Sequence, residues 1–220
     1  MVKIFTSGSF FDPREVPPAF LDDVAALFAG KVVIAETRTE YVAEDVLTSF
    51  RENLEAGGNA AALYVAMGLE TTNDYIRDKC IRKGHTFDDF KDAVETARRA
   101  DVGIKTYLMM KPPYLTEREA LADMKKSIRE VIPPYSDIIS MNLCTIQTRT
   151  EVEQYWKQGS YRPPYLWSAL MRCSPPTTMC SVTRLAEANG GGDPPTTAAN
   201  VTMKLWMRLM STTVRETRFT

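Results

Sequence analysis

The chain has 220 residues, a net charge of −1 and 44% hydrophobic residues, which suits one large globular domain. The near-neutral charge excludes a protein that coats nucleic acid with its whole surface, although a local basic patch stays compatible with it. No apolar run approaches the roughly 20 residues that span a bilayer, and the N-terminal residues lack the layout of a signal peptide. We therefore expect a soluble, cytoplasmic protein without a membrane partner.

Five β/α units follow one another along the chain. Short apolar runs predict strands at residues 3–6, 31–38, 61–70, 104–110 and 137–142. Amphipathic patterns predict helices at residues 17–29, 42–56, 71–84, 86–100, 116–131 and 149–157. Strands that alternate with helices through short connections require an α/β fold with a parallel sheet and right-handed crossovers. The strand count favours an open or partial barrel over a closed barrel of eight strands.

Helix start signals support two of these boundaries. Thr86 and Asp89 have the spacing of a capping box with Asp in place of Glu, and Thr116 with Glu119 caps the next helix. Residues 71–73 offer N-caps for the helix that follows the third strand.

Polar side chains gather where the predicted strands end. They are Ser7 and Ser9, Glu36 and Arg38, Glu70, Lys111, Asn142 and Gln147. In β/α barrels this edge of the sheet carries the chemistry. The turn formed by Ser7, Gly8 and Ser9 has small residues whose N–H groups can hold an anion or the polar end of a cofactor.

Each of these candidates has a second interpretation that the sequence leaves open. Glu36 and Arg38 either contact a ligand or form a structural ion pair, and Glu70 either contacts a ligand or caps the next helix. His85, the only histidine, follows a glycine that stops a helix, and we interpret it as a turn residue rather than a catalyst. The aromatic residues 161–167 either stack a base or a partner or pack the end of the barrel.

The four cysteines, Cys80, Cys144, Cys173 and Cys180, are scattered and form no CxxC pair. Their spacing predicts ordinary reduced thiols rather than a zinc site or a disulfide framework, and no metal ligand is assigned.

Five segments carry a family resemblance: residues 4–10, 65–71, 83–84, 107–113 and 161–168. They include the motifs Lys-Pro-Pro at 111–113 and Tyr-Arg-Pro-Pro at 161–164. Together they resemble the radical SAM family of archaeosine biosynthesis (RaSEA), within the wider elongator/MiaB/NifB-type radical SAM group. The resemblance implies a partial (β/α)6 barrel, in agreement with the units counted above.

The resemblance also implies cofactors, a substrate and a partner. The cofactors are S-adenosylmethionine (SAM) and a [4Fe–4S] cluster held by three cysteines, and a 5′-deoxyadenosyl radical from SAM would abstract hydrogen from the substrate. The implied substrate is tRNA that carries a lysine-substituted 7-cyano-7-deazaguanine at position 15, on which a lyase-type C–N cleavage leaves archaeosine. The implied partner is the archaeosine lysine transferase.

Site residues carry over from this resemblance by position. Ser7, Gly8 and Ser9 stand where the group's turn meets the methionine amino end of SAM. Glu36 and Arg38 end the next strand, where ribose or carboxylate contacts are usual. Gly68 and Glu70 match the following motif near SAM, and we add Lys111 to the cofactor-binding set. No catalytic residue is assigned.

Two departures from the family set the expected domain organisation. The three cluster cysteines of the family lie on a loop after the first strand, and this chain opens at what resembles the second strand. We therefore expect residues 1–170 to be a fragment of the barrel that is inactive alone. Residues 171–220 lose the family pattern, and we expect an out-of-frame, irregular tail. If the codons for residues 194–213 are read in a frame shifted by two nucleotides, they permit the family's Pro-His-Asn-Cys-Gly-x-Cys motif.

Two other functions remain as alternatives. The first is a cluster-free β/α module that binds tRNA or the lysine transferase through residues 161–167. The second is an unrelated β/α lyase that uses Glu36, Glu70 and Lys111 as acid–base groups.

Overall fold

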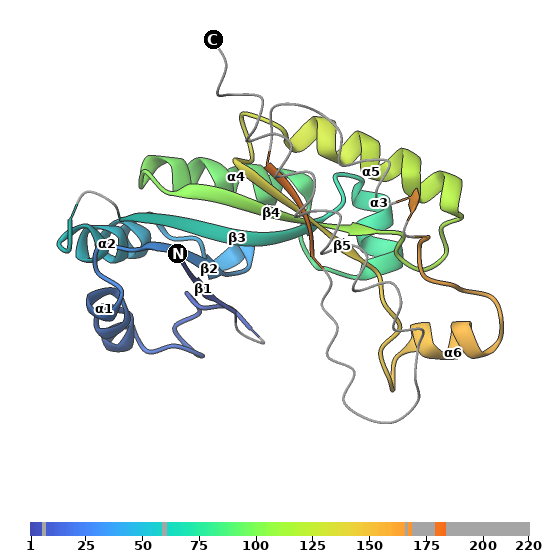
Figure 1. Cartoon of the computed structure of the whole chain (residues 1–220), viewed down its shortest axis with the longest axis horizontal. Helices are drawn as coiled ribbons and strands as arrows, with labels where there is room; N and C mark the ends of the chain where they lie inside the picture. The colour runs from blue at the N-terminus through green and yellow to red at the C-terminus, as the bar shows by residue number, and fades with distance from the viewer. Residues whose placement is uncertain (6–7, 59–60, 166, 169–178, 184–220) are drawn as a thin grey trace, which may run out of the picture.

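A computed structural model of the chain describes residues 1–5, 8–58, 61–165, 167–168 and 179–183, the last range for its backbone only (Figure 1). Six strands form one parallel sheet in chain order. They are β1 (Val2–Ile4), β2 (Val32–Glu36), β3 (Ala62–Glu70), β4 (Gly103–Met110), β5 (Ile138–Leu143) and β6 (Met179–Thr183). Within the described residues β1 and β6 are the two edges of the sheet, so the predicted open, partial barrel is confirmed.

The connecting helices match the predicted order. They are α1 (Pro18–Leu27), a short 3₁₀ turn (Thr39–Tyr41), α2 (Glu44–Glu55), α3 (Asp74–Ile76), a π-helix (Arg77–Ile81), α4 (Phe87–Arg99), α5 (Glu117–Val131) and α6 (Glu151–Lys157). In Figure 1, α4 and α5 lie along one long side of the sheet, and α1 and α2 lie beside its β1–β2 end.

Alternation of side chains along the strands decides which face is covered. Leu63, Val65 and Met67 of β3 belong to the large apolar core that also includes buried residues of α1, α2, α4 and α5. Tyr64 and Ala66, one position out of phase, belong to a small separate cluster on the other face. Because side chains alternate between the two faces, the helices cover one face of the sheet. The polar residues at the carboxyl ends of the strands on the other face can then form a site.

An aromatic cluster fixes the loop after β1. The rings of Phe10, Phe11 and Phe50 of α2 meet edge to face, with centroids 5.1 to 5.6 Å apart. The main-chain N–H of Phe10 also donates to the carbonyl of Glu36 at 2.9 Å. Burial of two consecutive aromatic side chains therefore holds this loop against the carboxyl end of β2.

The predicted caps are present. Thr86 and Asp89 form a reciprocal capping box at α4, and Thr116 and Glu119 form another at α5. Asn73 caps α3 by accepting the N–H groups of Tyr75 and Ile76. The helical segment predicted for residues 71–84 is shorter than expected: α3 and the π-helix together run from Asp74 to Ile81 and end where Arg82 takes a left-handed conformation.

The region after residue 168 differs from the expectation in one place. The sequence predicted no regular element between residue 171 and Val201, yet β6 pairs in parallel with β5, with Ile138 opposite Met179. Backbone pairing satisfies the N–H and C=O groups along β5 whatever the side-chain pattern of its neighbour, so a strand can form without a hydrophobic period. The domain boundary expected at residue 170 and most of the expected out-of-frame tail lie outside the described residues.

Among the described residues, no helix combines the length and the apolarity that crossing a membrane requires.

Candidate cofactor site

A cavity of about 720 Å³ lies at the carboxyl ends of the central strands. Its lining includes Glu36 of β2, Gly68 and Glu70 of β3, Tyr107 and Met109 of β4, and Asn142 of β5. This volume is ample for a nucleoside-sized cofactor. Of the strand-end residues that the sequence placed along one edge, the structure brings together Glu36, Arg38, Glu70, Asn142 and Gln147.

The end of β3 holds a partly buried ion pair. The ammonium of Lys83 lies 2.8 Å from Oε1 of Glu70, with side chains 31% and 8% exposed. Gly68 makes this approach possible, because a β-carbon there would lie 2.6 Å from Lys83 Nζ and 2.7 Å from Glu70 Oε1. Glu70 itself has a positive φ of 66°, which costs a non-glycine residue energy and turns its carboxylate into the cavity wall. Asn73 caps the following helix, so the capping interpretation of Glu70 is wrong.

Glu36 lines the cavity with its carboxylate. Among the described residues its carboxylate makes no hydrogen bond or ion pair. Burial raises its pKa, and Glu70 adds to that shift, whereas Lys83 and Lys105 oppose it. A half-buried carboxylate of this kind is well suited to accept hydrogen bonds from a bound ligand.

Arg38 lines the cavity but does not pair with Glu36. Its Nε lies 2.7 Å from Oε1 of Glu40, on the 3₁₀ turn that follows. The structural ion pair considered for Glu36 and Arg38 is therefore wrong. The strand ends at Glu36, so the rule that residues two apart share a face no longer applies at Arg38.

The turn predicted at Ser7, Gly8 and Ser9 supports the cavity through contacts within the protein rather than through N–H groups offered to a ligand. Ser7 lies outside the described residues. Gly8 lines the cavity, and a β-carbon there would overlap the Glu15 carboxylate. Ser9 is fully buried: its N–H donates to Glu15 Oε2 at 2.9 Å, and its Oγ accepts the N–H of Arg38 at 3.1 Å. Because its N–H is already bonded, Ser9 braces the loop and does not offer that group to an anion.

Lys111 is not among the lining residues. Its ammonium donates to the carbonyl of Arg162 at 2.9 Å and lies 3.1 Å from Glu117 Oε2. Its φ of 58° directs it toward the 161–165 segment, and the Tyr161 hydroxyl donates back to the Lys111 carbonyl at 3.0 Å. The cofactor contact predicted for Lys111 has no counterpart in the lining, and the residue anchors that segment instead.

His85 is a cavity residue that sequence reasoning missed. It lies in the irregular loop between the π-helix and α4, and it lines the cavity. Burial lowers its pKa to about 4, helped by the charges of Arg77 and Lys83 and opposed by Glu40 and Asp89. The ring is therefore neutral at pH 7. Its position after a helix stop gave no sequence signal of this placement.

Three buried side-chain atoms in the described part of the chain have no hydrogen-bond partner: Glu70 Oε2, His85 Nε2 and Asn142 Oδ1. All three residues line this cavity. Buried polar atoms are nearly always paired, so unpaired ones that share a cavity mark positions where a ligand or ordered water can bond. Two of them are oxygen acceptors, and with Glu36 they suit a ligand rich in N–H and O–H donors. The ammonium, ribose hydroxyl and adenine amino groups of SAM fit this requirement.

An iron–sulfur cluster does not fit the described residues. They contain no group of three or more His, Cys, Asp or Glu side chains that could hold a metal ion. Burial raises the pKa of the thiols of Cys80 and Cys144, which favours the protonated form over the thiolate that a cluster needs. Cys173 and the side chain of Cys180 lie outside the described part.

Comparisons with known proteins identify the relatives of this chain. Archaeosine synthase subunit beta of Methanosarcina acetivorans is 45% identical over 174 residues, which cover 77% of this chain and 49% of that protein. The protein of the same name from Thermococcus kodakarensis is 38% identical over 173 residues, which cover 77% of this chain and 52% of that protein. The chain thus spans about half the length of the curated relatives it matches.

The fold has a solved counterpart in Elp3 of the archaeon Methanocaldococcus infernus, with its N-terminus deleted. That structure superposes with a TM-score of 0.58 at 20% identity, over 80% of this chain and 42% of that chain. At this identity the likeness supports the barrel fold alone. The sequence profile of the radical SAM superfamily matches residues 4–126. With its parallel partial barrel and its strand-end cavity, the chain belongs to the radical SAM superfamily and is similar to archaeosine synthase subunit beta.

Proposed function

We propose that this chain supplies the SAM-binding barrel of a radical SAM tRNA-modifying enzyme of archaeosine biosynthesis. The observation that carries the proposal is the strand-end cavity, in which Glu70 Oε2, Asn142 Oδ1 and the carboxylate of Glu36 have no hydrogen-bond partner among the described residues. Superfamily membership adds the chemical class, and the archaeosine synthase relatives add the pathway.

Each residue has a definite role in this proposal. Glu36 and Glu70 accept hydrogen bonds from the donor groups of SAM, and Gly68 leaves room for the Lys83–Glu70 pair behind them. His85 adds a neutral imidazole to the wall. When bound, SAM supplies the radical chemistry of the superfamily. The finer reaction that we propose is lyase-type C–N cleavage of a lysine-modified 7-cyano-7-deazaguanine at tRNA position 15, with the lysine transferase as partner.

We also propose that these 220 residues alone are inactive, because their four cysteines lack the CxxxCxxC spacing. Anaerobic reconstitution with iron and sulfide, followed by assays of bound iron and acid-labile sulfide, tests this. Stoichiometric cluster on the purified chain would refute it.

The SAM site is tested by calorimetric titration of the chain with SAM. Replacing Glu36 by Gln removes a charged acceptor. This weakens a hydrogen bond to a cationic or polar donor by about 1.5–3 kcal/mol, or about 10- to 150-fold in Kd. Glu55→Gln, at the amino-terminal edge of the sheet, is the matched control and should bind SAM like the wild type. Equal SAM affinity in Glu36→Gln and the wild type, or no binding by the wild type, would overturn the assignment.

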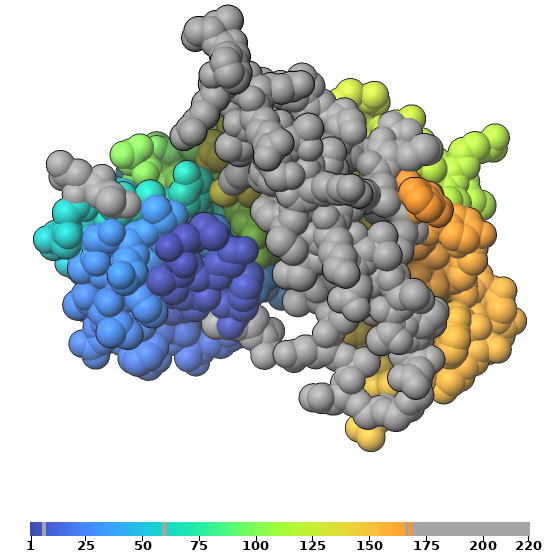
Figure 2. Space-filling view, in the orientation of Figure 1, coloured from blue at the N-terminus to red at the C-terminus, as the bar shows by residue number. Residues whose placement is uncertain are grey.

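A second candidate function is a binding module, and one observation favours it. Tyr165 and Trp167 are 55% and 75% exposed, and the Arg162 guanidinium stacks 3.3 Å from the centre of the Tyr165 ring. In Figure 2 the segment after β5, in orange, lies on the opposite side of the molecule from the N-terminal elements. Exposed aromatic rings with a stacked arginine are suited to unpaired nucleobases.

Titration of fluorescent tRNA separates the two functions on one sample. If the chain is a tRNA-binding module, Trp167→Ala weakens tRNA binding while SAM binding is unchanged. Phe20→Ala removes an exposed aromatic side chain of α1 and serves as the control. tRNA affinity that is the same in all three proteins would exclude this surface.

A further inference from the structure

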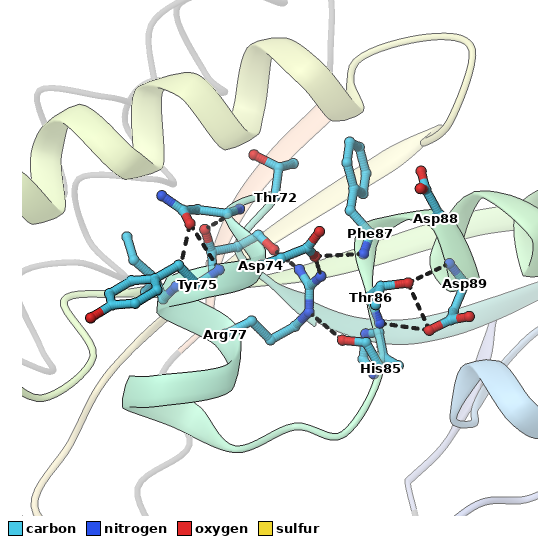
Figure 3. A network of polar contacts seen from close by, with 12 residues as sticks. Thr72, Asp74, Tyr75, Arg77, His85, Thr86, Phe87, Asp88 and Asp89 are labelled. Atoms are coloured by element: carbon cyan, nitrogen blue, oxygen red, sulfur yellow. Dashed lines mark hydrogen bonds and ion pairs between the residues drawn. The ribbon is translucent and has the colours of Figure 1, made fainter.

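Arg77 is a charged side chain buried inside the structure, and the proposed function gives it no role. It belongs to the π-helix between β3 and α4, and it is only 1% exposed (Figure 3). A buried guanidinium must be paired and hydrogen-bonded, because the cost of removing it from water is otherwise not offset. π-helices are also frequent near functional sites.

The guanidinium bonds three separate segments. Its Nε donates to the carbonyl of His85 at 2.7 Å, Nη1 donates to the carbonyl of Thr71 after β3, and Nη2 pairs with Asp74 Oδ1. The same Asp74 oxygen accepts the N–H of Phe87, the first residue of α4, at 2.8 Å. Arg77 and Asp74 therefore join the end of β3, the π-helix and the start of α4.

The loop that this network encloses forms one wall of the cavity. Arg82, Lys83 and His85 all line it, and Lys83 carries the ion pair with Glu70. Arg82 begins the loop in a left-handed conformation with φ 58°. Thr86 ends it at the α4 capping box, where its N–H donates to Asp89 Oδ2 at 2.7 Å. Between these two ends, the bond from Arg77 to the His85 carbonyl fixes the loop at the residue before Thr86.

We propose that Arg77 is a positioning residue of the cofactor cavity: through the main chain of His85 it places both the His85 imidazole and the Lys83–Glu70 pair. Calling the cavity a cofactor site rests on the proposed function, whereas the placement of the loop does not. Arg77 acts only through other residues, because it is not among the lining side chains.

Lysine cannot replace arginine in this role. The planar guanidinium has several N–H donors that reach acceptors on three segments at once. The ammonium of lysine is a single compact group and cannot reach all three. In Arg77→Lys we therefore expect the loop to loosen while the positive charge stays. The imidazole of His85 then becomes more accessible to water, and its pKa rises from about 4 toward 6.5.

The test is a histidine NMR titration of the 220-residue chain, which is unambiguous because His85 is the only histidine. The matched control is Arg51→Lys, since Arg51 also donates to a main-chain carbonyl, that of Ala100 at 2.9 Å, but at the opposite edge of the sheet. We expect the pKa of His85 to rise in Arg77→Lys and to stay unchanged in Arg51→Lys. SAM affinity should fall about tenfold only in Arg77→Lys, by analogy with the loss of metal affinity when a residue that orients a metal ligand is replaced.

Unchanged His85 titration in a folded Arg77→Lys protein would overturn the proposal. If that variant does not fold, Asp74→Asn decides, because its side chain is 59% exposed and the amide still accepts from Phe87. A wild-type His85 titration in Asp74→Asn would equally overturn the proposal. The NMR measurement needs no SAM, so a wild type that fails to bind SAM refutes the proposed function and leaves the positioning role to be judged separately.

Discussion

Gly68→Ala should destabilise the chain by displacing a side chain rather than by straining the backbone. The new β-carbon would lie 2.6 Å from Lys83 Nζ and 2.7 Å from Glu70 Oε1, so the ion pair must open. Breaking a fully buried pair costs about 3–5 kcal/mol, and a surface pair is worth about 0–1 kcal/mol. Lys83 is 31% exposed and Glu70 is 8% exposed, so we expect about 2 kcal/mol.

The mechanism predicts strong coupling between positions 68 and 83. Lys83→Ala removes the same ion pair, and it also costs about 2 kcal/mol. Once Lys83 is absent, the Glu70 carboxylate has no ion pair to lose when the β-carbon at position 68 displaces it, so the double variant should lose about 2 kcal/mol rather than about 4. Thermal unfolding measures this as a shift in Tm of about 4–8 °C in each single variant and about the same in the double variant. Additive losses would refute the reasoning, because the cost of Gly68→Ala would then arise elsewhere.

Two further predictions concern His85 and Tyr161. The pKa of His85 is lowered from 6.5 to about 4 in the folded chain, so the unfolded chain binds a proton at higher pH than the folded chain does. The contribution of the neutral His85 to stability is therefore fully present above pH 6.5 and is lost as the pH falls toward about 4. Urea unfolding at both ends of this range should show that loss in the wild type, and His85→Gln should show less of it; an identical pH dependence would contradict the assignment. Tyr161→Phe removes a buried hydroxyl that lies 3.0 Å from the Lys111 carbonyl and 3.3 Å from the Cys144 carbonyl, and it should cost about 1 kcal/mol in urea unfolding. A stability equal to that of the wild type would show that this hydroxyl does not anchor the 161–165 segment.

The sequence determined the order and type of the elements. Apolar runs of strand length alternate with amphipathic helices, and such a chain can bury its strands only in a parallel sheet covered by helices. The capping boxes at Thr86 and Thr116 could also be predicted from the sequence, because a capping box is a contact between residues three apart. Topology then brings Glu36, Gly68 and Glu70 to one edge whatever the details of packing.

The partner of each polar side chain was decided only by the tertiary structure. Arg38 pairs with Glu40 rather than Glu36, and Lys111 turns toward Glu117 and away from the cavity. Both residues lie just past a strand end, where the period of two stops and the local φ and ψ angles set the direction of the side chain. Spacing along the chain carries no information about that direction.

The same reason explains Arg77, His85 and β6. Arg77 appears as one more charge on a predicted amphipathic helix, but the π-helix and the end of β3 enclose it. His85 joins the cavity because the Arg77 network holds its loop there, and β6 forms because β5 offers unpaired backbone groups. Local pattern determined which elements exist, and contacts between residues distant in the sequence decided which side chains face the cavity.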